Sequence, residues 1–150
     1  MTWPIQLIQT KGRLVMMVEY PMDFRIIHTD GRPHQKDPDP TFNGDSVAHW
    51  EGDTLVIDVT GFNDRTWLDR AGNFHSDALH VVERYTARSR NIIDYEATIE
   101  DPNVFSRPWK IRMPLYRHVE ENAHLLEYQC IPYAEDVVYG HLRHKEGDSK

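Results

Sequence analysis

Apolar and polar residues alternate along much of this chain with the two-residue period of β-strands. Trp109, Ile111, Met113 and Leu115, for example, are separated by polar or bulky positions, which is the pattern of a half-buried strand. Segments rich in Gly, Asn, Asp and Ser separate such runs. We therefore expect about nine strands, at residues 5–9, 13–19, 23–29, 46–50, 54–60, 79–88, 92–100, 107–117 and 123–130.

Most of the connections are short, but two are long. Gly12 and Gly52 stand at tight turns, where a positive φ suits a hairpin. Residues 31–44 contain three prolines and two glycines and can form neither a long strand nor a helix. Residues 61–77 are rich in Asn, Asp and Gly and indicate a second ordered loop. Loops of this length are often functional.

Short strands joined by successive hairpins favour an all-β fold. We predict an antiparallel up-and-down β-barrel of about eight or nine strands with two long loops. Residues 1–138 are expected to form this single domain, and residues 139–150 a polar C-terminal tail. A barrel of about eight strands can hold one small ligand in its mouth.

Charge and composition narrow the range of partners. The 150 residues include 17 basic and 24 acidic side chains, and no basic stripe could neutralise the phosphates of a nucleic acid. No apolar run approaches the roughly 20 residues of a membrane helix, and residues 1–4 do not begin a signal peptide. We expect a soluble chain with no nucleic-acid or membrane partner. The single cysteine, Cys130, excludes an intrachain disulfide but does not identify the compartment.

Histidine is unusually frequent, with nine residues in the chain. His34, His75 and His80 lie in or beside the two long loops, and three imidazoles with a water form the open coordination of a catalytic zinc. Their spacing matches no established metal motif. Solvated or hydrogen-bonded histidines are the alternative. His28 fits a histidine that packs in the core.

Acid–base chemistry has further candidates. Glu83 shares a strand face with apolar residues, and burial of its carboxylate would suit a general base. A structural salt bridge, for instance with Arg25 across the sheet, explains Glu83 equally well. Asp64 and Arg65 could orient a polar substrate, with Trp67 as an apolar wall, although such segments are also common in well-ordered turns.

Several motifs are similar to those of a large, poorly characterised bacterial family. They are RIIHTDGRPH, GDSVAHWEGDTLVIDV, HSDALHVVERY and IEDPNVFSRPW, and the resemblance spans residues 5–130. It implies a lipocalin-like β-barrel, and many members carry an export signal and an extra N-terminal segment. The resemblance marks Asp30, Arg32, His34, Trp50, Gly52, Asp53, His80, Glu83 and Arg84. It attaches no reaction to them.

Together these features predict a small-molecule hydrolase in the barrel mouth. Its substrate would be an ester or phosphoester, as in a phosphotriesterase, and a divalent metal, zinc above all, would be held by the three histidines. Glu83 or Asp64, with Arg65, would do the acid–base work, and the substrate would contact Trp67, Arg32 and Tyr85. Two alternatives stay open: a non-catalytic lipocalin-like protein that binds a small hydrophobic ligand, and a metal-free isomerase or dehydratase that uses His and Glu. A homo-oligomer is compatible with all three interpretations.

Overall fold

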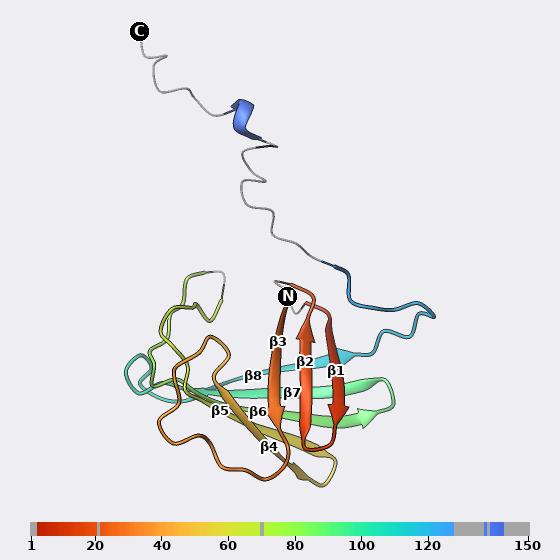
Figure 1. The fold of residues 1–150 in the computed structure, drawn as a ribbon, viewed down its shortest axis with the longest axis horizontal. Coiled ribbons are helices and arrows are strands. Elements are labelled where there is room, and N and C mark those ends of the chain that lie inside the picture. Colours follow the sequence, from red (N-terminus) through yellow and green to blue (C-terminus); the bar gives the residue numbers. More distant parts are fainter. Residues whose placement is uncertain (1–2, 21, 70, 128–136, 138, 143–150) are drawn as a thin grey trace.

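The protein folds as a single curled β-sheet (Figure 1). The computed structural model describes residues 3–20, 22–69, 71–127, 137 and 139–142. Eight strands follow one another across the sheet in chain order. They are β1 (Ile5–Thr10), β2 (Arg13–Val18), β3 (Asp23–His28), β4 (Asp45–Glu51), β5 (Thr54–Thr60), β6 (His80–Ser89), β7 (Ile92–Glu100) and β8 (Trp109–Tyr116). A short 3-10 helix, η1, covers Gly140–Leu142.

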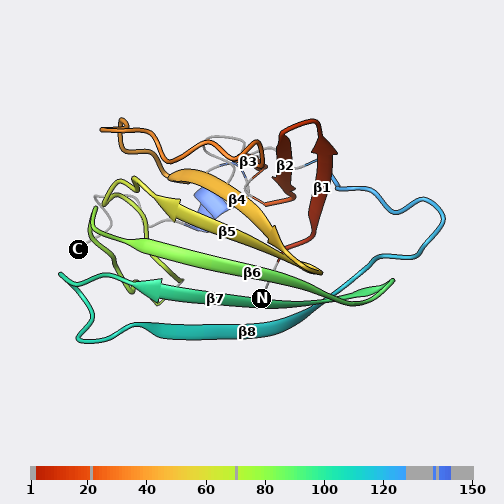
Figure 2. The ribbon, with the colours of Figure 1, turned by 90° about the horizontal axis from the view of Figure 1, so that it is seen from below.

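The sheet is a half-barrel with two open edges. β1 to β3 cross over the hollow side of the layer formed by β4 to β8 (Figures 1 and 2). No pairing joins β1 to β8 within the described residues, so the predicted closed barrel is wrong. The all-β prediction is confirmed.

The connection from β3 to β4 also departs from the predicted up-and-down order. All other neighbouring strands are antiparallel, but β3 and β4 run parallel and share only the pairs Ile27–Ser46 and His28–Val47. The proline-rich residues 29–44 cannot form a tight hairpin, and they carry the chain back to the start of β4. This short pairing lies where the sheet turns from one layer into the other (Figure 2).

Most predicted strands lie within a residue or two of the observed ones. β5 has the predicted bounds, and β6 begins and ends one residue later than expected. The predicted strand at 123–130 is absent over residues 123–127, and residues 128–130, with Cys130, lie outside the described part. Most of the predicted tail at 139–150 lies outside it too.

Alternation along the strands gives the sheet an inner and an outer face. Leu55, Ile57 and Val59 of β5 pack inward with residues of β2, β3, β4 and β6. The main core consists of Leu14, Met16, Ile27, Ala48, Leu55, Ile57, Val59 and Tyr85. A second cluster, Leu79, Ala97 and Ile99, extends it toward Phe62 and Phe105. Between the inward residues of β5 lies Asp58, which therefore belongs to the outer face.

Candidate functional site

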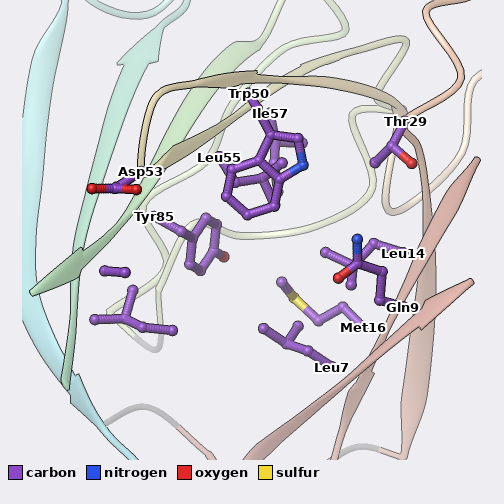
Figure 3. Close-up of a pocket in the computed structure, with 12 residues that line it drawn as sticks. Leu7, Gln9, Leu14, Met16, Thr29, Trp50, Asp53, Leu55, Ile57 and Tyr85 are labelled. Atoms are coloured by element: carbon purple, nitrogen blue, oxygen red, sulfur yellow. The ribbon is translucent and has the colours of Figure 1, made fainter. Parts of the chain in front are cut away.

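A cavity opens on the inner face between the two layers. It has a volume of about 200 Å³. The lining residues come from β1, β2, the β3–β4 loop and β4 to β7: Leu7, Gln9, Leu14, Met16, Thr29, Trp50, Asp53, Leu55, Ile57, Tyr85, Ala87 and Ile93. In Figure 3, Leu7, Gln9, Leu14 and Met16 lie opposite Trp50, Leu55, Ile57 and Tyr85 across the space.

The walls of the cavity are apolar and buried, and its rim is more exposed to solvent. Leu14, Met16, Leu55 and Ile57 are all buried core residues that nevertheless line the cavity. Trp50, at the end of β4, is 57% exposed and presents its indole to the cavity. This combination of apolar walls with a few polar groups is typical of small-molecule sites.

A buried polar network lies beside the cavity, centred on Glu83 of β6. Glu83 Oε2 receives a hydrogen bond from Arg25 Nη2 of β3 at 2.5 Å. Its Oε1 accepts from the hydroxyls of Tyr95, at 2.9 Å, and Tyr85, at 3.2 Å. The proposed salt bridge between Glu83 and Arg25 across the sheet is thus confirmed. Arg25 also contacts the sulfur of Met16, so the network touches two residues that line the cavity.

The charges in this network balance. Arg25 and Glu83 form a neutral pair on the inner face. Burial raises the pKa of both Tyr85 and Tyr95, and the charge of Glu83 raises it further. Both phenols therefore keep their protons and donate to the carboxylate. Glu83 accepts hydrogen bonds from three donors, which is the arrangement of a structural ion pair rather than of a free base.

A second group of polar residues lies on the outer face, where His34 and His80 meet at Asp58. His34 Nε2 lies 2.7 Å from Asp58 Oδ1, and His80 Nε2 lies 3.1 Å from Asp58 Oδ2. Asp58 comes from the middle of β5, His80 begins β6, and His34 comes from the long loop. We call these residues, with Asp45 and Glu100, the histidine–carboxylate cluster.

The far nitrogen of each imidazole also faces a carboxylate. His34 Nδ1 lies 3.0 Å from Asp45 Oδ2, and His80 Nδ1 lies 3.9 Å from Glu100 Oε2. The second contact is longer than a hydrogen bond but lies within ion-pair range. Asp45 is also bound by the guanidinium of Arg32 and by the backbone amide of Gln35, which tie the loop to the start of β4.

Electrostatics keep both aspartates of the cluster ionised. Burial would raise the pKa of Asp45, but hydrogen bonds from Arg32, Gln35 and His34 outweigh it and lower the pKa to about 2. At Asp58, burial likewise acts upward, and hydrogen bonds from His80 and His34 bring the pKa below its ordinary value. Asp45 and Asp58 therefore carry their negative charges at neutral pH.

His75, the third predicted metal ligand, has other partners. Its Nε2 lies 2.7 Å from the Thr66 hydroxyl, and its Nδ1 donates to the Ser76 carbonyl at 2.9 Å. The ring is buried edge-on against Phe62. No hydrogen bond or ion pair of the described residues joins His75 to His34 or His80. Within that part of the chain, no group of three or more His, Cys, Asp or Glu side chains is already arranged around a metal position.

The remaining predicted residues are spread over both faces. Asp64 and Arg65 are exposed in the loop after β5, where the Arg65 amide binds Asn63. Trp67 is 71% exposed and pairs with Phe74 through an isolated β-bridge. Tyr85 lines the cavity, whereas Arg32 pairs with Asp45 of the histidine–carboxylate cluster. The structure thus gathers His34, His80 and Arg32 in one place and Glu83 and Tyr85 in another.

Sequence reasoning missed three carboxylates of the cluster, Asp45, Asp58 and Glu100. The sequence could have indicated Asp58 as a candidate site residue, because it is the one charged residue in the otherwise apolar and β-branched strand TLVIDVT. Its closeness to His80 depends on the register between β5 and β6, in which Asp58 is paired with Val82. Alternation alone could not supply that register.

Comparison with known proteins gives no match. No family model, no curated protein and no solved structure matches this chain. Among the helices of the described residues, none has the length and apolar character needed to cross a membrane.

Proposed function

We propose that the protein binds one small, uncharged, apolar molecule in the inner cavity. The observation that carries this proposal is the cavity itself, whose walls are core side chains such as Leu14, Met16 and Ile57. Removing an apolar ligand from water is favourable at about 25 cal/mol per Å² of buried surface. A lipocalin-like binding role rests on the same support, namely a ligand-sized cavity inside a curled, mainly antiparallel sheet.

The cavity volume limits the size of the ligand. An apolar cavity of about 150 Å³ engineered in another protein binds benzene. The cavity of about 200 Å³ in this protein therefore suits a fused aromatic ring system or a short branched alkyl group. Its open rim at Trp50 and Asp53 leaves room for a longer ligand to extend into solvent.

The charges around the cavity favour a neutral ligand. Arg25, which contacts the cavity-lining Met16, already has Glu83 as its counter-ion, so it offers no free positive charge to a carboxylate or sulfonate. Asp53 at the rim adds a negative charge. An anionic ligand would lose its hydration without gaining a partner, which is costly in an apolar site.

Hydrolysis remains a prediction from the sequence without added support. Its proposed base Glu83 is engaged by Arg25 and two tyrosines, and Asp64 and Arg65 have no contact with the cavity-lining residues among the described hydrogen bonds. Binding requires only the apolar walls, which are present. Binding is therefore the function that the geometry supports best.

Titration with two related fluorescent probes tests this proposal. N-phenyl-1-naphthylamine is neutral, and 8-anilino-1-naphthalenesulfonate has the same aromatic skeleton with a sulfonate. We expect the neutral probe to bind with one site per chain, and the anionic probe to bind about tenfold more weakly or worse, because a charge loses its hydration in the cavity.

Leu7→Trp and Ile8→Trp form a matched pair of variants. These neighbours in β1 are similarly exposed, but Leu7 lines the cavity and Ile8 lies on the opposite face. Leu7→Trp should fill the cavity and weaken binding of the neutral probe by about tenfold or more, whereas Ile8→Trp should leave it unchanged. Absence of binding, or an equal effect of the two substitutions, would contradict the proposal.

A further inference from the structure

The histidine–carboxylate cluster on the outer face has an imbalance of charge. Within the described part of the chain, the ion pairs of Asp45, Asp58 and Glu100 include one cation besides the imidazoles, the guanidinium of Arg32, which leaves two negative charges when the imidazoles are neutral. A neutral imidazole has one N–H group, yet both nitrogens of His34 and His80 face carboxylates. On each ring, one nitrogen lone pair would thus point at an anionic oxygen. Two extra protons or one divalent cation would balance the cluster.

We propose that the cluster binds one divalent transition-metal cation through His34 Nε2, His80 Nε2 and the carboxylate of Asp58. Two imidazoles and one carboxylate are a ligand set suited to zinc, iron, manganese or cobalt. Asp58 thus replaces His75 as the third ligand. The ion would supply two positive charges and take the place of the two hydrogen bonds that now join the imidazoles to Asp58.

The residues behind the imidazoles strengthen this assignment. Histidines that bind metals almost always donate their other N–H to a carboxylate, a carbonyl or a water. Asp45 holds Nδ1 of His34 at 3.0 Å, and Glu100 faces Nδ1 of His80 at 3.9 Å. With an ion bound, each ring would keep its proton on Nδ1, against these carboxylates, and Nε2 would bind the ion in place of its present hydrogen bond to Asp58.

Little movement is needed to admit an ion. Ligands about 2.1 Å from a tetrahedral ion lie about 3.4 Å from one another. The imidazole nitrogens lie 2.7 and 3.1 Å from the two Asp58 oxygens, so a rotation of that carboxylate and a small shift of the His34 loop make room. Asp58 and His80 are each 37% exposed, which leaves a path for the ion and a position for a water.

The cluster is independent of the inner cavity. Asp58 lies between Ile57 and Val59, which pack inward, so its carboxylate is on the other side of the sheet. None of the cluster residues lines the cavity. Loss of metal binding would therefore leave binding of the neutral probe intact, and the two proposals fail separately.

Titration of the chelator-treated full chain with Co²⁺ or Zn²⁺ alone tests the site. We expect one ion per chain by calorimetry, and visible Co²⁺ absorption bands that show imidazole and carboxylate ligands. Asp58→Asn and His80→Ala should each weaken binding by about a hundredfold, and Glu100→Gln by about tenfold, as for residues that orient metal-binding histidines.

His49→Ala is the control. His49 lies on the same outer face, and its hydrogen bond and ion pair among the described residues are with Glu51 and not with the cluster, so its loss should not change the affinity. Thermal unfolding of each variant checks its fold, and the isosteric Asp58→Asn keeps the test valid if His80→Ala unfolds. Absence of Co²⁺ and Zn²⁺ binding, or binding that survives both Asp58→Asn and His80→Ala, would overturn the proposal. So would histidine NMR signals showing both rings doubly protonated at neutral pH without metal uptake.

Discussion

At the scale of single residues, the buried ion pair between Arg25 and Glu83 allows a clear prediction about stability. A buried ion pair stabilises a fold only weakly compared with apolar packing, but removing one partner leaves an uncompensated charge. Glu83 is only 6% exposed and binds three donors, so its carboxylate cannot exchange them for water. Among the hydrogen bonds of the described residues, this pair is the one that joins β3 to β6 across the two layers of the half-barrel.

Glu83→Leu should destabilise the protein by about 3–5 kcal/mol, because the Arg25 guanidinium is left buried and unpaired. The double variant Arg25→Met, Glu83→Leu should recover most of that loss. Urea unfolding of both variants measures the difference. Glu51→Leu, which removes an ion pair with Arg84 on the exposed outer face, should have little effect. If the double variant is no more stable than Glu83→Leu alone, the loss of stability does not come from the unpaired Arg25 guanidinium.

At the scale of elements, the start of β4 determines how the chain passes from one layer to the other. Gly44 has φ of 66°, and an added Cβ would lie 2.6 Å from the Thr60 carbonyl oxygen of β5 and 2.9 Å from Val59. Only glycine allows β5 to approach so closely while the chain turns into β4. The same junction positions Asp45, which holds Arg32 and His34.

Gly44→Ala should therefore cost about 2 kcal/mol or more in the free energy of unfolding, from the strained φ and the backbone clash together. Gly31→Ala separates the two effects. Gly31 also has a positive φ, of 80°, but nothing lies within 4 Å of an added Cβ, so only the conformational cost of about 1 kcal/mol should remain. Equal losses of stability in the two variants would show that the contact with Thr60 is unimportant.

At the scale of the whole molecule, the sequence predicted the strands better than the way they assemble. Runs of apolar and β-branched residues bounded by turn residues located β5 and β6 almost to the residue. These runs did not predict the open edges, since closure depends on whether β1 reaches β8, a long-range contact that no local pattern encodes. The parallel contact of β3 and β4 was missed for the same reason.

In the candidate sites, too, individual residues were predicted better than the contacts between them. Glu83 and Arg25 could be paired in advance because each is a charged residue on the inward face of a strand. His34 and His80 were selected by composition and lie together, but their shared partner Asp58 depends on strand register. His75 was grouped with them because it also lies in a long loop, and the structure places it with Thr66 and Phe62 instead.

One measurement tests the binding function most directly. Met16 and Met17 are neighbours in β2, but Met16 lines the inner cavity and Met17 lies on the outer face. With ¹³C-labelled methionine methyl groups, addition of N-phenyl-1-naphthylamine should shift the NMR signal of Met16 through the ring current of the bound probe and leave Met17 in place. A shift of Met17 with Met16 unchanged, or no shift of either signal at saturating probe, would contradict the account.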